Sequence, residues 1–182
     1  MWLWRELYSV SINFFDLFGL KNTFKLDVNT LETNYRAIQS TSHPDRFVTA
    51  SSSDKLQSMQ TATLANEAYL TLKNPANRAK YCLQLQNIDA INDTNTSMPA
   101  DFLMQQMDWR EGLEDAKQAK DIAALEALLA EMQLASNALQ TNLITSIDEQ
   151  KDYSKATCDT RKLIFIDKVS ADIHKAIESL DI

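Results

Sequence analysis

A proline interrupts two helix-forming segments in the first third of the chain, and this interruption constrains the fold most. Pro44 lies within the short polar stretch 42–47, which reads SHPDRF. Its ring fixes φ, removes a backbone N–H donor and disfavours the α conformation of the preceding His43. A continuous helix is therefore excluded here, and we expect the side chains of His43 and Asp45 on a stiff loop between two helices.

The segments on either side of this loop carry apolar residues at helical spacing. Asp27 can cap the first, which we predict as a helix over residues 27–41, and serines 51–53 can cap the second, predicted over residues 53–72. The predicted apolar face of the second helix consists of Leu56, Met59, Leu64, Ala68, Tyr69 and Leu72. Two such helices joined by a short loop are expected to pack antiparallel along their apolar stripes.

The rest of the chain also predicts helices. Asn74 and Pro75 can start a helix over 75–86, and an aromatic segment over 13–20 predicts a short one. After a polar connector over 87–98, apolar periodicity predicts helices over 99–119, 122–149 and 153–180. Short connections between these three favour a three-helix bundle. Only two glycines and three prolines occur in 182 residues, so the expected fold class is all-α.

Catalysis is not expected. His43 and Asp45 could act as an acid–base pair, but no nucleophile motif accompanies them, and Gly19 and Gly112 alone cannot form a phosphate-binding loop. We therefore predict that the chain is not an enzyme.

Neither a metal nor a cofactor is predicted. The possible ligands Cys82, Cys158, His43 and His174 fit no zinc spacing, and two cysteines cannot supply four ligands to an iron–sulfur cluster. Both cysteines lie on predicted helices, where we expect buried free thiols.

Charge and hydropathy exclude two further classes of partner. No apolar run approaches the ~20 residues of a membrane span, and no signal peptide is recognisable. Residues 1–82 carry nine basic and seven acidic side chains, whereas residues 83–182 carry nine and eighteen. Nucleic-acid binding by the acidic half is therefore not expected. The asymmetry fits two modules with different partners, or simply solvated acidic helix faces.

Several motifs together resemble a known family. They are the aromatic segment 14–20, His43-Pro44-Asp45, the segment 66–72 (NEAYLTL), and Asn74-Pro75 with Arg78 and Tyr81. These features resemble a J-domain. Residues 102–104, 110–111 and 161–168 resemble the C-terminal domain of HscB-type co-chaperones, which serve iron–sulfur cluster assembly. The resemblance covers residues 13–182 and implies a J-domain over 13–86, the connector over 87–98 and a scaffold-binding bundle over 99–182. Residues 1–12 lie outside the resemblance, and we expect either a short helix packed on the J-domain or an N-terminal extension from an upstream start codon.

The resemblance implies a chaperone-binding surface in the first domain. Its residues would be His43, Pro44, Asp45, Arg36 and Arg46, and its partner a specialised seventy-kilodalton heat-shock chaperone (HscA-like) whose ATPase is stimulated. Basic residues usually line the helix before the loop in J-domains. Here Arg36 is followed by the neutral residues 39–41 (QST).

The resemblance also implies a surface that binds the iron–sulfur scaffold protein (IscU-like). Met104, Asp108, Glu111 and Asp115 recur at spacings of four, three and four, so they share one helix face, with Leu103 and Met107 beside it and Phe165 from the last helix. Alternatively Leu103, Met107 and Phe165 are core residues. A general J-domain co-chaperone with a different client is the alternative function. We expect a monomer in the bacterial cytoplasm.

Overall fold

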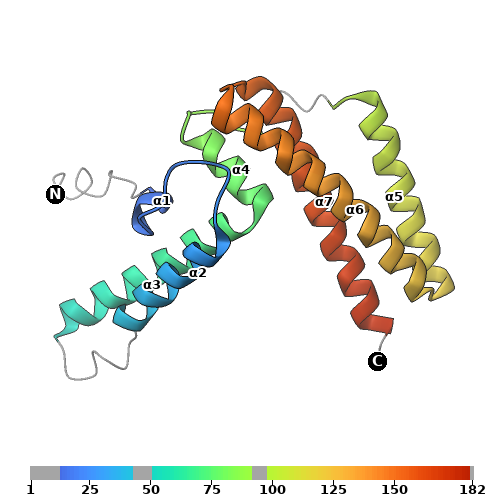
Figure 1. Cartoon of the computed structure of the whole chain (residues 1–182). Helices are drawn as coiled ribbons and strands as arrows, with labels where there is room; N and C mark the ends of the chain where they lie inside the picture. Colours follow the sequence, from blue (N-terminus) through green and yellow to red (C-terminus); the bar gives the residue numbers. More distant parts are fainter. Residues whose placement is uncertain (1–12, 43–50, 92–97, 181–182) are drawn as a thin grey trace, which may run out of the picture. The chain divides into compact units, whose positions relative to one another are not determined.

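The computed structural model describes residues 13–42, 51–91 and 98–180. Every regular element in these ranges is a helix (Figure 1), which confirms the predicted all-α class. The chain divides into two compact units, residues 1–74 and 75–182. The first unit contains α1 (Phe14–Leu17), α2 (Val28–Ser42) and α3 (Ser52–Lys73); the second contains α4 (Pro75–Gln84), α5 (Ala100–Ala119), α6 (Ile122–Leu143), a π-helix (Ile144–Glu149) and α7 (Tyr153–Leu180).

The first unit is a helical hairpin with a short helix packed on it. α2 packs along α3, and α1 contacts α3. The core of this unit is formed by the fully or almost fully buried side chains of Phe15, Phe18, Phe24, Leu31, Ala65, Ala68 and Leu72. Phe15 of α1, with Phe18 just after it, is therefore buried where α1 packs on the hairpin.

Polar caps start both helices of the hairpin at the predicted places. The Asp27 carboxylate accepts a hydrogen bond from the backbone N–H of Asn29 (3.0 Å) and another from the hydroxyl of Thr30. The hydrogen bond from Thr30 is the main reason that the pKa of Asp27 is lowered. At the start of α3, the Ser51 hydroxyl accepts from the backbone N–H of Asp54 (3.2 Å).

The predicted apolar face of α3 is wrong in its first half. Leu56 and Met59 are 58% and 60% exposed, whereas Ser58 is buried. The buried line runs from Ser58 through Ala65 and Ala68 to Leu72, so small and polar residues face α2 here. The periodicity of apolar residues alone predicts the wrong buried face for this half of α3. The reason is that the Ser58 hydroxyl is buried by its hydrogen bond to the backbone at the end of α2.

Pro75 separates α3 from α4. Asn74 has an extended backbone (φ −79°, ψ 121°), because the proline ring disfavours the α conformation of the residue before it. By packing, α4 belongs to the second unit, since it lies against α7. The resemblance to the family places residues 75–86 in the J-domain. Packing of α4 in this structure does not test that family boundary, so the assignment stays a prediction.

The start of the predicted connector is also fixed to the second unit. Ala90 is fully buried, and its carbonyl oxygen accepts a hydrogen bond of 2.6 Å from Nε of Arg161 on α7. The connector is therefore bound to α7 at Ala90. Residues 92–97 lie outside the described part of the chain.

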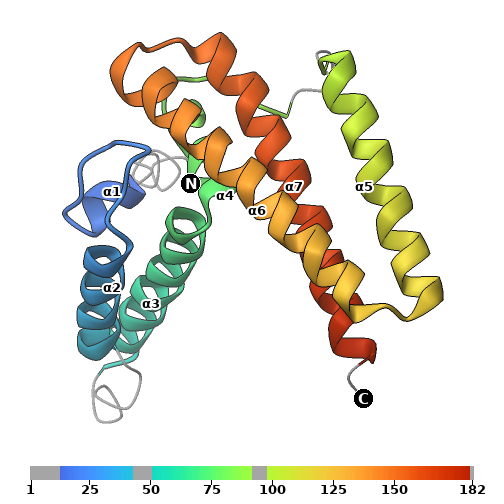
Figure 2. The same ribbon diagram turned by 45° about the vertical axis from the view of Figure 1, so that its right-hand side comes forward.

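Three long helices make up most of the second unit. Figure 2 shows α5, α6 and α7 lying side by side, with α6 antiparallel to the other two. α5 and α6 are joined through Lys120, which has φ 53°, and the Asp121 carboxylate caps α6 by accepting from the backbone N–H of Ala124. We predicted one continuous helix over 122–149. Instead its last turns, from Ile144, form the π-helix, which buries Ser146 beside Ile147.

Candidate interaction surfaces

The central motif of the first candidate surface, His43-Pro44-Asp45 with Arg46, lies outside the described residues. The helix ends on either side of it are described. The Ser58 hydroxyl on α3 donates a buried hydrogen bond of 2.7 Å to the carbonyl oxygen of Ser42, the last residue of α2. The point where the loop leaves α2 is thereby attached to α3.

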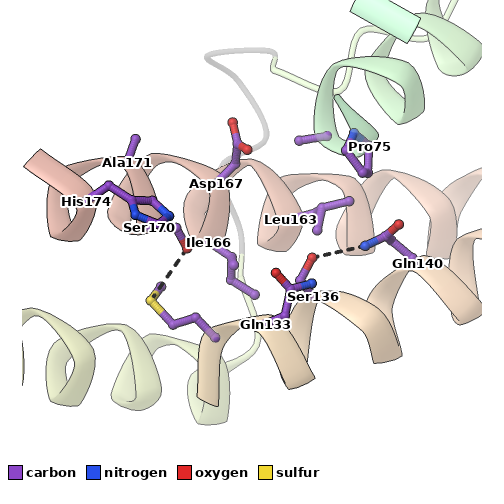
Figure 3. Close-up of a pocket in the computed structure, with 12 residues that line it drawn as sticks. Pro75, Gln133, Ser136, Gln140, Leu163, Ile166, Asp167, Ser170, Ala171 and His174 are labelled. Carbon is purple, nitrogen blue, oxygen red and sulfur yellow. Dashed lines mark hydrogen bonds between the residues drawn. The ribbon is translucent and has the colours of Figure 1, made fainter. Parts of the chain in front are cut away.

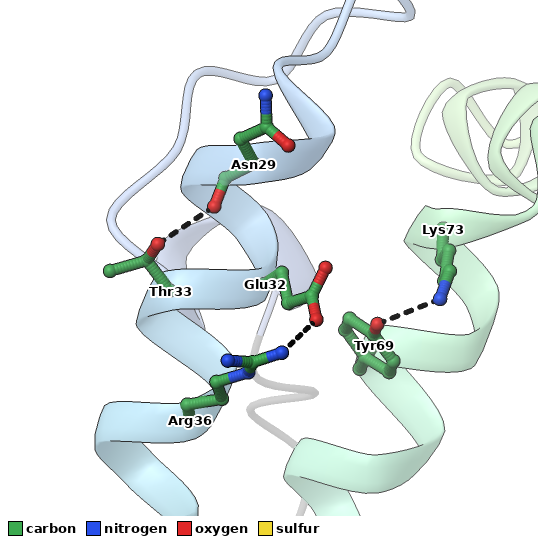
Figure 4. Close-up of polar contacts among 6 residues, drawn as sticks. All are labelled: Asn29, Glu32, Thr33, Arg36, Tyr69 and Lys73. Carbon is green, nitrogen blue, oxygen red and sulfur yellow. Dashed lines mark hydrogen bonds and ion pairs between the residues drawn. The ribbon is translucent and has the colours of Figure 1, made fainter.

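Arg36 is the other predicted chaperone-binding residue, and it lies on the outer face of α2. Its side chain is 76% exposed and forms an ion pair with Glu32, one turn earlier (Figure 4). A pair this exposed adds little to stability, so the guanidinium remains available to a partner.

A second cation, Lys73 at the end of α3, lies near the same face. Its ammonium donates a hydrogen bond of 3.0 Å to the Tyr69 hydroxyl and lies 5.2 Å from the centroid of that ring. The bond to Tyr69 is the main reason that the pKa of Lys73 is raised, and attraction to Glu32 adds to it. The Tyr69 ring stacks on Tyr35 of α2, with centroids 4.0 Å apart.

The second candidate surface is the outer face of α5, and the structure brings its predicted residues together. Met104 and Met107 are 67% and 69% exposed, and Leu103 is 46% exposed. The carboxylates of Asp108, Glu111 and Asp115 are exposed as well. The alternative that Leu103 and Met107 are core residues is therefore excluded. We call these six residues the Leu-Met-acid face.

Phe165 lies elsewhere: it is half-buried where α7 meets α5. Its ring centroid is 5.9 Å from that of Phe102, edge to face, and 6.4 Å from that of Trp109, nearly parallel. The guanidinium of Arg110 lies 5.4 Å above the same ring. Phe165 thus joins the inner side of α5 to α7.

Trp109 anchors α5 to α6 as well. Its indole is 2% exposed, and Nε1 donates a hydrogen bond of 2.8 Å to the carboxylate of Glu131 on α6. Sequence reasoning assigned no role to Trp109 or Glu131. The available signal was a large aromatic residue between two charged ones, Asp108 and Arg110, on a predicted helix.

A pocket of about 310 Å³ lies elsewhere in the second unit, between α6, α7 and the start of α4 (Figure 3). Its lining mixes apolar and hydrogen-bonding groups: Pro75, Ala76, Met132, Gln133, Ser136, Gln140, Leu163, Ile166, Asp167, Ser170, Ala171 and His174. The charged and titratable members, Asp167 and His174, are exposed. None of these residues was predicted as a site residue.

Within the described ranges, no cluster of three or more His, Cys, Asp and Glu side chains is placed to hold a metal ion. Cys82 on α4 is a buried free thiol, and burial raises its pKa to about 12. Cys158 on α7 is free and half-buried. Among the same residues, no helix combines the length and the hydropathy needed to cross a membrane.

The fold defines a class: an all-helical protein with a hairpin unit and a bundle unit, with no strand in the described residues. Comparison with known proteins identifies the family. The model of the HSCB C-terminal oligomerisation domain matches residues 98–174. Co-chaperone protein HscB homologs of Burkholderia mallei and Burkholderia thailandensis are 46% and 44% identical to the chain over 175 residues, covering 96% of it and 99% of each relative.

Solved structures agree. Chaperone HscB from Vibrio cholerae matches with a TM-score of 0.79 and 38% identity, over 93% of this chain and 99% of that one. The crystal structure of human co-chaperone protein HscB matches with a TM-score of 0.82 and 26% identity, over 92% and 83%. The chain therefore belongs to the HscB family of co-chaperones, and the hairpin formed by α2 and α3 is that of its J-domain.

Proposed function

We propose that this protein is a co-chaperone of iron–sulfur cluster assembly that delivers the cluster scaffold protein to a specialised seventy-kilodalton heat-shock chaperone and stimulates that chaperone's ATPase. Family membership supports the co-chaperone role. The observation that carries the scaffold role is the exposed Leu-Met-acid face of α5, because apolar side chains of this size are exposed together with carboxylates on one face of one helix.

On the chaperone side, the chemistry takes place in the partner. The His43-Pro44-Asp45 loop and Arg36 supply contacts, and the carboxylate of Asp45 can accept charge-assisted hydrogen bonds from an arginine of the ATPase domain. Such contacts stimulate hydrolysis only if they are stronger in the chaperone's hydrolysis-competent conformation than in its other conformations. The co-chaperone thus changes a conformational equilibrium and is not consumed.

On the scaffold side, the composition of the Leu-Met-acid face fits a reversible contact. Met104 and Met107 are flexible and polarisable, so they adapt to a partner's surface, and Leu103 adds apolar area. Asp108, Glu111 and Asp115 keep the face soluble when it is free and favour a partner surface that carries basic residues. Phe165 supports this contact from below by holding α5.

The test is steady-state ATP hydrolysis by the candidate chaperone alone, with this protein, with the scaffold protein, and with both. Hydrolysis that rises more with both than the two separate increases predict would support delivery of the scaffold. Stimulation by this protein without synergy would contradict the scaffold role and leave a general J-domain co-chaperone with a different client. The absence of any stimulation would contradict both.

Variants separate the two surfaces. His43→Gln should abolish stimulation and leave scaffold binding unchanged. The double variant Met104→Ala with Glu111→Ala should weaken scaffold binding at least tenfold and leave stimulation by the co-chaperone alone intact. The matched control is Leu134→Ala with Glu126→Ala, which removes an equally exposed apolar and acidic pair from α6. An equal loss of scaffold affinity in the control would refute the assignment to α5.

A further inference from the structure

The outer face of α2 carries no net charge of its own. Glu32 and Arg36 are its two charged residues, and they pair with each other. A surface that is to attract an acidic partner through this helix therefore needs a cation from outside it.

α3 supplies that cation at the level of Glu32. Figure 4 shows the Arg36 guanidinium beside the carboxylate of Glu32, and on α3 the Lys73 ammonium beside the Tyr69 hydroxyl. The Tyr69 ring that holds Lys73 stacks on Tyr35 of α2, which places this ammonium near α2. Attraction to Glu32 is the last of the causes that raise the pKa of Lys73. Glu32 forms its ion pair with Arg36, and Lys73 adds a second exposed cation, so the three groups together carry one positive charge.

Lys73 is held in place before any partner arrives. Its ammonium bonds to the Tyr69 hydroxyl and lies over that ring, and the ring is stacked on Tyr35 of α2. The Tyr35 hydroxyl is fixed in turn by its 2.6 Å hydrogen bond to the side chain of Asn66. A lysine positioned in this way loses less side-chain entropy on docking than a free one.

We propose that Lys73 is a docking residue of the chaperone-binding surface, which with Arg36 presents two cations to an acidic surface of the chaperone's ATPase domain, and that Glu32 weakens this docking. The inference rests on the proposed function and deepens it. It explains how docking is retained although residues 39–41 of α2 are neutral: the missing positive charge comes from α3.

The arrangement predicts effects of opposite sign. Removing the charge of Lys73 lowers the positive potential of the face, whereas removing the charge of Glu32 raises it. Each substitution changes one exposed charge that interacts with the chaperone. The loss or gain of one such interaction changes the affinity by about two- to fivefold. Both effects shrink in high salt, because the Debye length is only about 10 Å at 0.1 M ionic strength.

The experiment measures, at low salt, the concentration of full-length co-chaperone that gives half-maximal ATPase stimulation. Lys73→Gln should raise it about two- to fivefold, Glu32→Gln should lower it by a similar factor, and Lys73→Arg should restore the wild-type value. The maximal stimulation should not change, because the His43-Pro44-Asp45 loop is intact. Lys175→Gln is the control: it removes an exposed lysine charge from α7, where Lys175 pairs with Asp172 of the same helix, and it should have no effect.

A purely structural role gives a different result. Both Gln variants lose a contact on the wild-type hairpin, so a structural role would shift both in the same direction and lower both melting temperatures. That result, or an unchanged half-maximal concentration in both variants, would overturn the inference. Stimulation by the wild-type protein would still support the proposed function. If the wild-type protein stimulates no chaperone, the proposed function fails first and the inference fails with it.

Discussion

The ring of Phe165 on α7 lies nearly parallel to the indole of Trp109 on α5, with 6.4 Å between the ring centroids. Phe102 contacts Phe165 edge to face, so three rings hold the first half of α5 to α7. The Leu-Met-acid face lies on the opposite side of the same helix. Its position therefore depends on a cluster that no partner needs to touch.

We expect Phe165→Ala to lower the free energy of unfolding by about 2–3 kcal/mol, because a half-buried ring is lost and a gap is left beneath α5. Met104→Ala, which removes a side chain that is 67% exposed, should change it by less than about 0.5 kcal/mol. Calorimetric unfolding of the two variants checks this difference. Equal stabilities would show that Phe165 does not support α5.

Helix ends were the most predictable part of this fold, because they are fixed by local chemistry. Asp27, Ser51 and Pro75 each act through their own side chain or ring on the adjacent backbone, so their effects can be read without knowing the tertiary structure. The orientation of α3 could not be read in this way. It depends on Ser58, which is buried because it bonds to the carbonyl oxygen of Ser42, sixteen residues earlier.

The candidate surfaces show the same division. Spacing alone placed Met104, Asp108, Glu111 and Asp115 on one face, because these residues belong to one helix. The position of Phe165 depends on how α7 packs against α5, and the stacking of Tyr69, which holds Lys73, on Tyr35 depends on how α3 packs against α2. Neither relation has a signal in the local sequence.

Gly112 offers a stabilising substitution. It lies in the interior of α5, and a Cβ added there would meet the side chain of Leu128 at 3.6 Å, an ordinary van der Waals contact. Since glycine in a helix interior costs about 1 kcal/mol relative to alanine, Gly112→Ala should raise the free energy of unfolding by about that amount. Calorimetric unfolding measures this gain in stability. A loss of stability in the variant would show that the added methyl group clashes with Leu128, and it would contradict the prediction.

The two cysteines should differ in reactivity. The buried Cys82 thiol, whose pKa is raised to about 12 chiefly by burial, is almost entirely protonated at pH 8, and the thiolate is the nucleophile. In the native protein we expect iodoacetamide to alkylate the half-buried Cys158 first, and Cys82 only on unfolding.

Mass spectrometry of the alkylated protein distinguishes the two sites. In the folded state, Cys158→Ser should remain almost unmodified over the reaction time that alkylates the wild type. In denaturant, every cysteine of both proteins should react. Rapid modification of Cys82 in the folded protein would contradict its burial between α4 and the rest of the second unit.

Asp159 on α7 should make stability depend on pH in a direction unusual for a carboxylate. It is 5% exposed, one carboxylate oxygen has no hydrogen-bond partner, and the other lies 3.8 Å from Nζ of Lys162. Burial raises the pKa of Asp159 above its ordinary 3.8, although Lys162 opposes the shift. The folded state therefore binds the proton more tightly than the unfolded state does. The contribution of Asp159 to stability consequently increases as the pH falls through the folded pKa towards 3.8, and it is smallest at neutral pH.

Asp159→Asn removes this titration while keeping the shape of the side chain. At neutral pH the variant should be at least as stable as the wild type, because the cost of burying a charge is gone. Its advantage should shrink as the pH falls from neutral to about 4, where the wild-type carboxyl becomes neutral as well. Comparing the two proteins at each pH cancels the opposite contribution of Asp27, whose lowered pKa stabilises the fold only above the acid range. Urea unfolding of both proteins between pH 4 and 7 measures the difference, and an advantage that grows towards low pH would contradict the assigned direction of the Asp159 shift.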